Sequence, residues 1–377
     1  MKRRASIKTL GYMGMWAVAL GACSFPAHAA DAQPRSLLLP GLAVQEAPRA
    51  AIPPRDPSEI TPATRAAIDR GLQFLVRSQN RDGSWRTNGS AGGYPVAMTS
   101  LAGIALLSGG NTPTQGPYAR NVSSAITYLL KSARSDGLIA QIEEETHCMH
   151  GHGFATLFLA LCYGMEEDPQ RLAQIRTVLQ RAVELTGASQ SAAGGWLYTP
   201  DAQSDEGSVT VTQVQALRAC RNVGIAVPKR VIDNAMNYLK NSANADGGIR
   251  YQVTDTGPSR PAITAAAVVC WFSAGEYENK DAKKALDFVQ KALSPAQHDA
   301  SQYFGHYFYA QFYMSQAMYL HGEKSWQSYY PLMRDTLVGL QSSDGSWDGD
   351  HVGTTYGTAV ALTILQLPYK NLTIMQR

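Results

Sequence analysis

The sequence lacks the features by which several classes of protein are recognised. No cluster of Lys and Arg follows the first few residues, and the formal net charge is only +3, so we do not expect nucleic acid as a partner. Past residue 30 the only cysteines are Cys148, Cys162, Cys220 and Cys270. Their spacing fits neither a zinc knuckle nor a dense disulfide framework. Three of them lie in apolar helical runs, which is typical of small buried thiols.

The N-terminus has the pattern of an export signal. Basic "MKRRASIKT" precedes apolar "LGYMGMWAVALGA", which is too short to span a bilayer, and "AHA" ends at Ala29. We predict a signal peptide at 1–29 and an exported protein, periplasmic or secreted. As an alternative, "LGAC" ending at Cys23 resembles a lipoprotein cleavage box, which would give contact with a membrane through lipidation alone. Proline-rich residues 30–58 predict an extended arm before a domain at 59–377.

One short motif occurs twice, as "QNRDGSW" at 79–85 and as "QSSDGSW" at 341–347. Weaker relatives are "DGLI" from Asp136, "AGGW" ending at Trp196 and "DGGI" from Asp246. Successive copies are 54, 57, 53 and 98 residues apart, and the last gap is the length of two units. A repeat at this period indicates one supersecondary unit per copy, six in all.

Each unit pairs an amphipathic helix with a helix that is apolar on nearly every side. A single buried stripe is typical of a helix at the surface, whereas a helix without a polar face is buried all round. We therefore predict an all-α fold, an (α/α)6 toroid of six helix hairpins, with the apolar helices as the inner ring. A linear solenoid is the alternative, but its end repeats would expose apolar faces. The predicted stripes are Ile68, Leu72, Leu75; Val122, Ile126, Leu129; Ile175, Leu179, Ala182; Ile232, Met236, Leu239; Leu286, Val289, Leu293; and Met333, Leu337, Leu340.

In such a fold the repeated motif has a structural reading. Asp-Gly favours a tight turn from the outer to the inner helix, and Trp packs over the junction. Gln79 and Gln341 can bond to the backbone of that turn. The motif is thus predicted to join neighbouring units and to take no part in catalysis.

The motif and the repeat resemble a known superfamily. "QNRDGSW" and "QSSDGSW" look like the QW motifs of squalene–hopene and oxidosqualene cyclases, and the six-unit plan is similar to that of protein prenyltransferase β subunits. The resemblance covers about residues 58–377. It is closest to exported bacterial prenyltransferase or squalene-cyclase repeat proteins. It implies the toroid fold and a central cavity for an isoprenoid or other apolar ligand.

The motifs that carry chemistry in this superfamily are absent. The cyclases protonate their substrate with Asp-x-Asp-Asp, and the nearest match here is Asp205 with Glu206, just before the third inner helix. Such a pair can hold a proton at raised pKa, or can simply cap the helix. The zinc-binding Asp-x-Cys of prenyltransferases is also missing, although His306 resembles the position of their histidine. Asp205, Glu206 and His306 are the candidate catalytic residues.

Histidines and tyrosines near the starts of inner helices are candidates for ligand binding. "EEETHCMHGHG" holds His147, His150 and His152, which could bind a divalent metal, form a hydrogen-bonded rim or transfer protons. No cofactor is assigned otherwise. The aromatic candidates are Tyr198, Tyr251, Tyr303, Tyr307 and Tyr356. Further polar residues near these starts are Asp201, Asp255, Arg260, Asp348, Asp350 and His351.

Three functions stay open at this point. The first is an isoprenoid-binding cavity, with or without activity as a divergent cyclase or transferase. The second is a non-catalytic extracytoplasmic scaffold that binds protein. The third is a carbohydrate-active enzyme, which would need two rim carboxylates such as Asp201, Asp205, Asp255 or Asp348.

Overall fold

The computed structural model describes residues 59–89, 93–293 and 306–376, and in these ranges it has twelve α-helices and no β-strand. This confirms the predicted all-α class. The predicted signal peptide, the proline-rich arm and Tyr303 lie outside the described residues.

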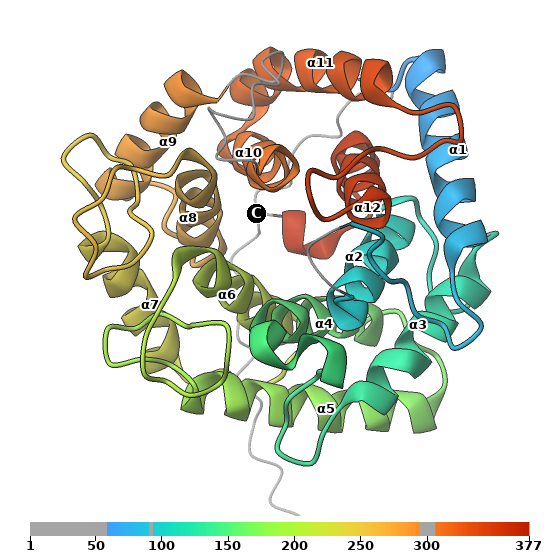
Figure 1. Cartoon of the computed structure of the whole chain (residues 1–377), viewed down its shortest axis with the longest axis horizontal. Helices are drawn as coiled ribbons and strands as arrows, with labels where there is room; N and C mark the ends of the chain where they lie inside the picture. Colours follow the sequence, from blue (N-terminus) through green and yellow to red (C-terminus); the bar gives the residue numbers. More distant parts are fainter. Residues whose placement is uncertain (1–58, 90–92, 294–305, 377) are drawn as a thin grey trace, which may run out of the picture. The chain divides into compact units, whose positions relative to one another are not determined.

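The helices form two concentric rings, as Figure 1 shows. Each inner helix packs on the next one, and α12 packs on α2, so the ring is closed. A closed toroid is therefore confirmed over a linear solenoid. The outer helices are α1 (Pro62–Ser78), α3 (Ala119–Ser132), α5 (Pro169–Ala188), α7 (Lys229–Asn241), α9 (Lys280–Ala292) and α11 (Glu323–Leu340). The inner helices are α2 (Pro95–Ser108), α4 (Cys148–Tyr163), α6 (Gly207–Asn222), α8 (Pro261–Ser273), α10 (Tyr307–His321) and α12 (Thr354–Leu365).

The burial of each helix follows its sequence pattern. Every residue of α2 and of α8 is buried, whereas the outer helices bury one stripe each. The prediction of a buried position was wrong for two stripe residues. Ile232 is only half-buried, because the stripe of α7 runs through its neighbour Val231 instead. Leu340 is 38% exposed, because it is the last residue of α11.

In five of the six repeats the described turn packs against the next outer helix. Gly83 has φ +92°, and a Cβ on it would lie 2.4 Å from Ser124 O in α3. The last turn returns to α1 and closes the ring. The equivalent close approaches are Gly137 to Arg181 O, Gly194 to Asn234 O, Gly247 to Lys284 O and Gly345 to Arg70 O.

A glutamine spans the same junction. Gln79 Nε2 donates to Gly83 O in its own turn at 2.9 Å and to Asn121 O of α3 at 3.1 Å. Gln190 and Gln341 make the same two kinds of bond in their units. The glutamine therefore ties three of the turns to the neighbouring unit, as the sequence predicts for Gln79 and Gln341.

The tryptophan after a turn is fixed to both helices of its unit, as it is at Trp85, Trp196 and Trp347. Trp85 Nε1 donates to Leu75 O of α1 at 2.8 Å, and Trp85 N donates to Thr99 Oγ1 of α2 at 2.9 Å. These bonds satisfy buried polar groups at the point where the chain reverses. The same backbone bond to a threonine recurs as Trp196 to Thr210, Ile249 to Thr264 and Trp347 to Thr358.

The C-terminal segment fills the ring beyond the carboxyl end of α12. Two 3₁₀ helices, η3 (Leu367–Tyr369) and η4 (Thr373–Met375), follow α12, and η4 packs on α6 and α10 inside the ring (Figure 1). The amino ends of the inner helices lie at the other end. Among the helices described here, none is long and apolar enough to cross a membrane.

The contact between turn and neighbouring helix can be tested with two glycines. Gly83→Ala should lower the free energy of unfolding by about 3 kcal/mol or more, because alanine brings both left-handed strain and a clash with Ser124 O. Gly275→Ala is the matched control, since Gly275 has φ +88° with open space around it. It should lose only about 1–2 kcal/mol in urea unfolding. Equal losses would show that the close approach is not required.

Candidate functional site

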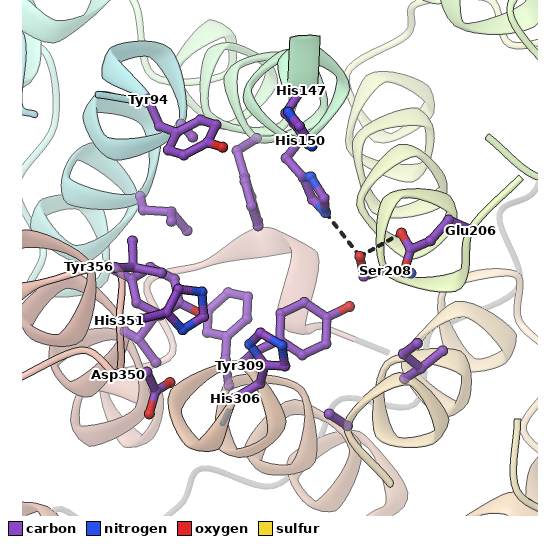
Figure 2. Close-up of a pocket in the computed structure, with 18 of the residues that line it drawn as sticks. Tyr94, His147, His150, Glu206, Ser208, His306, Tyr309, Asp350, His351 and Tyr356 are labelled. Atoms are coloured by element: carbon purple, nitrogen blue, oxygen red, sulfur yellow. Dashed lines mark hydrogen bonds between the residues drawn. The ribbon is translucent and has the colours of Figure 1, made fainter. Parts of the chain in front are cut away.

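A cavity of about 620 Å³ opens among the amino ends of the inner helices. All six inner helices, or the loops just before them, contribute to it (Figure 2). Its walls are largely apolar, and side chains do not fill it. The main apolar lining residues are Met98, Leu101, Phe154, Ile263, Phe312 and Val360.

The polar residues of the cavity come from repeat-equivalent positions. Five of them are the N-cap residues of α2, α4, α6, α8 and α10: Tyr94, His147, Glu206, Arg260 and His306. Since the inner helices point the same way, positions far apart in the sequence meet on one rim. The loop before α12 and its first turn add Asp350, His351 and Tyr356.

A hydrogen-bonded chain crosses from α4 to α6 on one wall. Ser208 Oγ donates to Glu206 Oε2 at 2.6 Å and lies 3.0 Å from His150 Nε2 (Figure 2). Burial, with a smaller effect of His147, lowers the pKa of His150 to about 4. His150 is therefore neutral at pH 7 and, with Ser208 donating to Glu206, its Nε2–H donates to Ser208 Oγ.

Glu206 is also a helix cap. Its carboxylate accepts from Ser208 N and Val209 N, both at 3.0 Å, at the first turn of α6. Burial raises its pKa, although these bonds act in the opposite direction. Glu206 thus combines the two roles that its sequence position allowed, a helix cap and a buried carboxyl group at the cavity.

Aromatic rings form the side of the mouth beside this chain. The Tyr198 ring lies 4.7 Å from the ring of His147 and 5.8 Å from that of His150, between centroids. The Tyr198 and Tyr251 hydroxyls are hydrogen-bonded to each other. Arg260 lies over the Tyr251 ring, 5.9 Å from its centroid. The two tyrosines are thus held as one wall.

Basic residues meet on the opposite side. The His306 and His351 rings are 5.2 Å apart, and burial together with the charges of His351 and Arg260 lowers the pKa of His306. Asp350 lies beside them, and its Oδ2 accepts from Phe308 N at 3.0 Å, capping α10 (Figure 2). Both carboxylates that line the cavity therefore bond to the amino end of a helix.

The structure brings most of the predicted site residues together. Those that line the cavity are Glu206, His306, His147, His150, Tyr198, Tyr251 and Tyr356. Asp205, His152 and Tyr307 do not line it, and Tyr303 lies outside the described residues. The sequence analysis missed Tyr94 and Ser208. They could have been found from their positions, because Tyr94 is the N-cap residue of α2 and Ser208 follows that of α6 by two residues.

Asp205 and Tyr307 point away from the cavity for geometric reasons. Asp205 precedes the N-cap, and its Oδ1 accepts from Val253 N at 3.3 Å in a neighbouring loop. Helical residues advance by about 100° each, so Tyr307 points to nearly the opposite side of α10 from Tyr309, which lines the cavity. Tyr307 packs instead against Phe308.

His152 occupies the structural threonine position of its repeat. Its Nδ1 accepts from Ile139 N at 3.2 Å, the bond that a threonine makes in four other units. Its Nε2 bonds to Thr186 Oγ1 at 3.1 Å. Both ring nitrogens of His152 are therefore used in the core, and His147, His150 and His152 do not converge.

No group of three or more His, Cys, Asp or Glu in the described part of the chain is arranged to hold a metal. Metal binding by this protein stays a prediction. Cys148, Cys162, Cys220 and Cys270 are free and buried, as the apolar helical runs around the last three predict.

A buried carboxyl group lies behind the rim. Glu144 belongs to the 3₁₀ helix η2 (Ile142–His147) and is 1% exposed. Its oxygens lie against Gly151 of α4, and burial raises its pKa to about 7. Its neighbour Glu143 pairs with Arg86 at 2.8 Å. The segment that carries His147 to the cavity thus contains a buried carboxyl group whose pKa lies well above its ordinary value.

Comparisons with known proteins agree with this fold. Residues 170–334 match a family model described as the squalene-hopene cyclase C-terminal domain. Drimenyl diphosphate synthase from Streptomyces showdoensis is 26% identical over 200 residues, 53% of this chain and 34% of its own length. The chain therefore spans about a third of the length of this curated relative.

Solved structures share the toroid. The type II terpene cyclase MstE from Scytonema matches with a TM-score of 0.57 and 17% identity over 82% of this chain and 99% of its own. It has also been solved with its substrate, geranylgeranyl dihydroxybenzoate. An α-1,6-mannanase of Salegentibacter sp. matches with a TM-score of 0.58 and 10% identity over 82% and 99%. At such identities these matches show the fold alone.

The fold and the cavity define an α/α toroid of the kind found in terpene cyclases and in glycosidases. Within that class, about half of the chain is distantly similar in sequence to squalene-hopene cyclase and to drimenyl diphosphate synthase. The predicted resemblance to the terpene cyclase superfamily is confirmed.

The structural role of His152 predicts how much two substitutions at this position lower the free energy of unfolding. His152→Ala leaves Ile139 N–H buried without an acceptor and should lower the free energy of unfolding by about 3 kcal/mol. His152→Thr restores an acceptor of the kind used in the other units and should lose only about 1–2 kcal/mol. Denaturant unfolding measures both. Equal losses for threonine and alanine would contradict this role.

Glu144 predicts a dependence of stability on pH. Its pKa is about 7 when folded and 4.5 as a free side chain, so between these values the folded protein holds the extra proton. The free energy of unfolding should then fall as pH rises from 4.5 to 7. Glu144→Gln should remove roughly 2–3 kcal/mol of that fall. Glu143→Gln, at the exposed neighbour, should keep it; an unchanged slope in Glu144→Gln would refute the prediction.

Proposed function

We propose that the protein binds an isoprenoid or similarly apolar ligand in its central cavity. The observation that carries this is the open cavity of about 620 Å³, apolar along its walls and polar at its mouth. This size and this division of surface are typical of sites that bury a small molecule. An elongated ligand would place its apolar part among Met98, Leu101 and Phe312 and its end at the rim.

The relatives support this class of ligand. A toroid of the same fold binds geranylgeranyl dihydroxybenzoate as its substrate, and the curated relative is named for a terpenoid diphosphate. Both lie at low sequence identity, so they suggest the chemical class and not the compound.

Binding has more support than a cyclisation that starts with protonation. Asp205 faces away from the cavity, and Glu206 and Asp350 accept backbone bonds at helix starts. A carboxyl group of raised pKa, as Glu206 is, is a weak acid for an alkene. The proposal is therefore a ligand-binding protein, and it does not require turnover.

The alternatives have less support. A scaffold without a ligand predicts a ring filled by side chains, whereas this ring is open. For carbohydrate cleavage, none of Asp201, Asp205, Asp255 and Asp348 lines the cavity. The polar rim and the fold shared with a mannanase keep a sugar among the ligands worth testing.

Native mass spectrometry of the mature protein, purified from its own host, tests the proposal. We expect a bound species with the mass of an isoprenoid lipid. Ala97→Phe should lose it, because Ala97 lines the cavity. Ala66→Phe, on the exposed face of α1, should keep it. The protein mass also tests the proposed export, which predicts a chain starting at Ala30 or a lipidated Cys23.

A protein that carries no ligand, or one whose ligand survives Ala97→Phe, would contradict binding in the cavity. A co-purified oligosaccharide would favour the carbohydrate alternative, and a stoichiometric protein partner on an empty toroid would favour the scaffold.

A further inference from the structure

A tyrosine of the cavity has a buried hydroxyl group that makes no hydrogen bond to any described residue. Tyr309, on α10, lines the cavity, and its Oη is buried without a partner. Its ring is held against Tyr313, with centroids 4.8 Å apart. A buried donor that is left unpaired costs about 1–3 kcal/mol, so a group that completes the bond is expected in the working protein.

Other buried tyrosines do not share this position. Tyr128 also has a buried hydroxyl without a hydrogen bond among the described residues, and Tyr238 and Tyr313 have buried hydroxyls, but none of the three lines the cavity. Tyr309 lines the cavity, so a ligand or water there can supply the partner that its Oη lacks. Burial raises the pKa of Tyr309 well above 10, so the hydroxyl keeps its proton and stays a donor.

The wall that faces Tyr309 offers acceptors. Figure 2 shows the Tyr309 hydroxyl on the side of the cavity toward Ser208 and Glu206, across from His150. Ser208 Oγ donates its proton to Glu206 and accepts a hydrogen bond from His150 with one lone pair. A hydroxyl oxygen has two lone pairs, so one lone pair of Ser208 is left to accept a proton. Ile263 and Phe312 add apolar surface to the lining of the same cavity.

We propose that this part of the cavity is a subsite for a hydroxyl group on the ligand, which accepts a hydrogen bond from Tyr309 Oη and finds an acceptor on the Ser208 wall. The cavity then selects an isoprenoid alcohol over a hydrocarbon with the same carbon skeleton. This inference rests on the proposed function and names the ligand class more narrowly. It involves binding alone, and no bond is made or broken.

Competition between two matched ligands tests the subsite. The delipidated mature protein is incubated with equal concentrations of geranylgeraniol and the hydrocarbon of the same skeleton, and native mass spectrometry counts the two complexes. In the wild type the alcohol complex should exceed the hydrocarbon complex about five- to tenfold, the effect of one hydrogen bond in a dry site. In Tyr309→Phe the ratio should fall to near one.

Tyr313→Phe is the matched control, because it removes a buried hydroxyl from the same helix outside the cavity lining. It should keep the wild-type ratio, and thermal unfolding checks that both variants fold. A wild-type ratio near one, with both complexes present, would overturn the subsite and leave the proposed function intact. A preference that survives Tyr309→Phe would also overturn it. If neither ligand binds, the proposed function fails and the subsite with it.

Discussion

The close approach of each turn glycine to the next outer helix is the contact on which the rest of the structure depends. A side chain at Gly83 would collide with Ser124 O, and the same holds at the other four turns. This contact sets the distance and the rotation that relate one helix hairpin to the next. Because the last turn, at Gly345, meets α1, the steps add up to a full circle. A glutamine and a tryptophan at each "DGSW" turn then hold the step in place.

Closure of the ring creates the site. Six inner helices that start at the same end bring their N-cap residues to one rim, so Glu206 and His306 can share a cavity although 100 residues separate them. The C-terminal segment fills the ring at the other end. The cavity is thus a product of the repeat, whereas its chemistry comes from the few positions where the repeats differ.

The fold was predictable from the sequence because the period of the repeat and the pattern of apolar residues both act locally. For the site, the sequence predicted which positions lie at the rim, but not which side chains point into the cavity. Glu206 and His150 were found because they lie at inner-helix starts, but a one-residue offset turns Asp205 out of the cavity. The prediction that Tyr307 lines the cavity was wrong, because it lies two residues from Tyr309 and so faces nearly the opposite side of α10. His152 looked like a metal ligand, although aligning it with Thr99 and Thr210 would have shown its structural role.

A crystal structure of the mature protein with geranylgeraniol is the most direct test of the central claim, that the ring is a container for an apolar ligand. The account predicts continuous density inside the ring, with the chain along Met98 and Phe312 and the hydroxyl beside Tyr309. Density confined to the outer surface, or a ring closed by its own side chains, would contradict it.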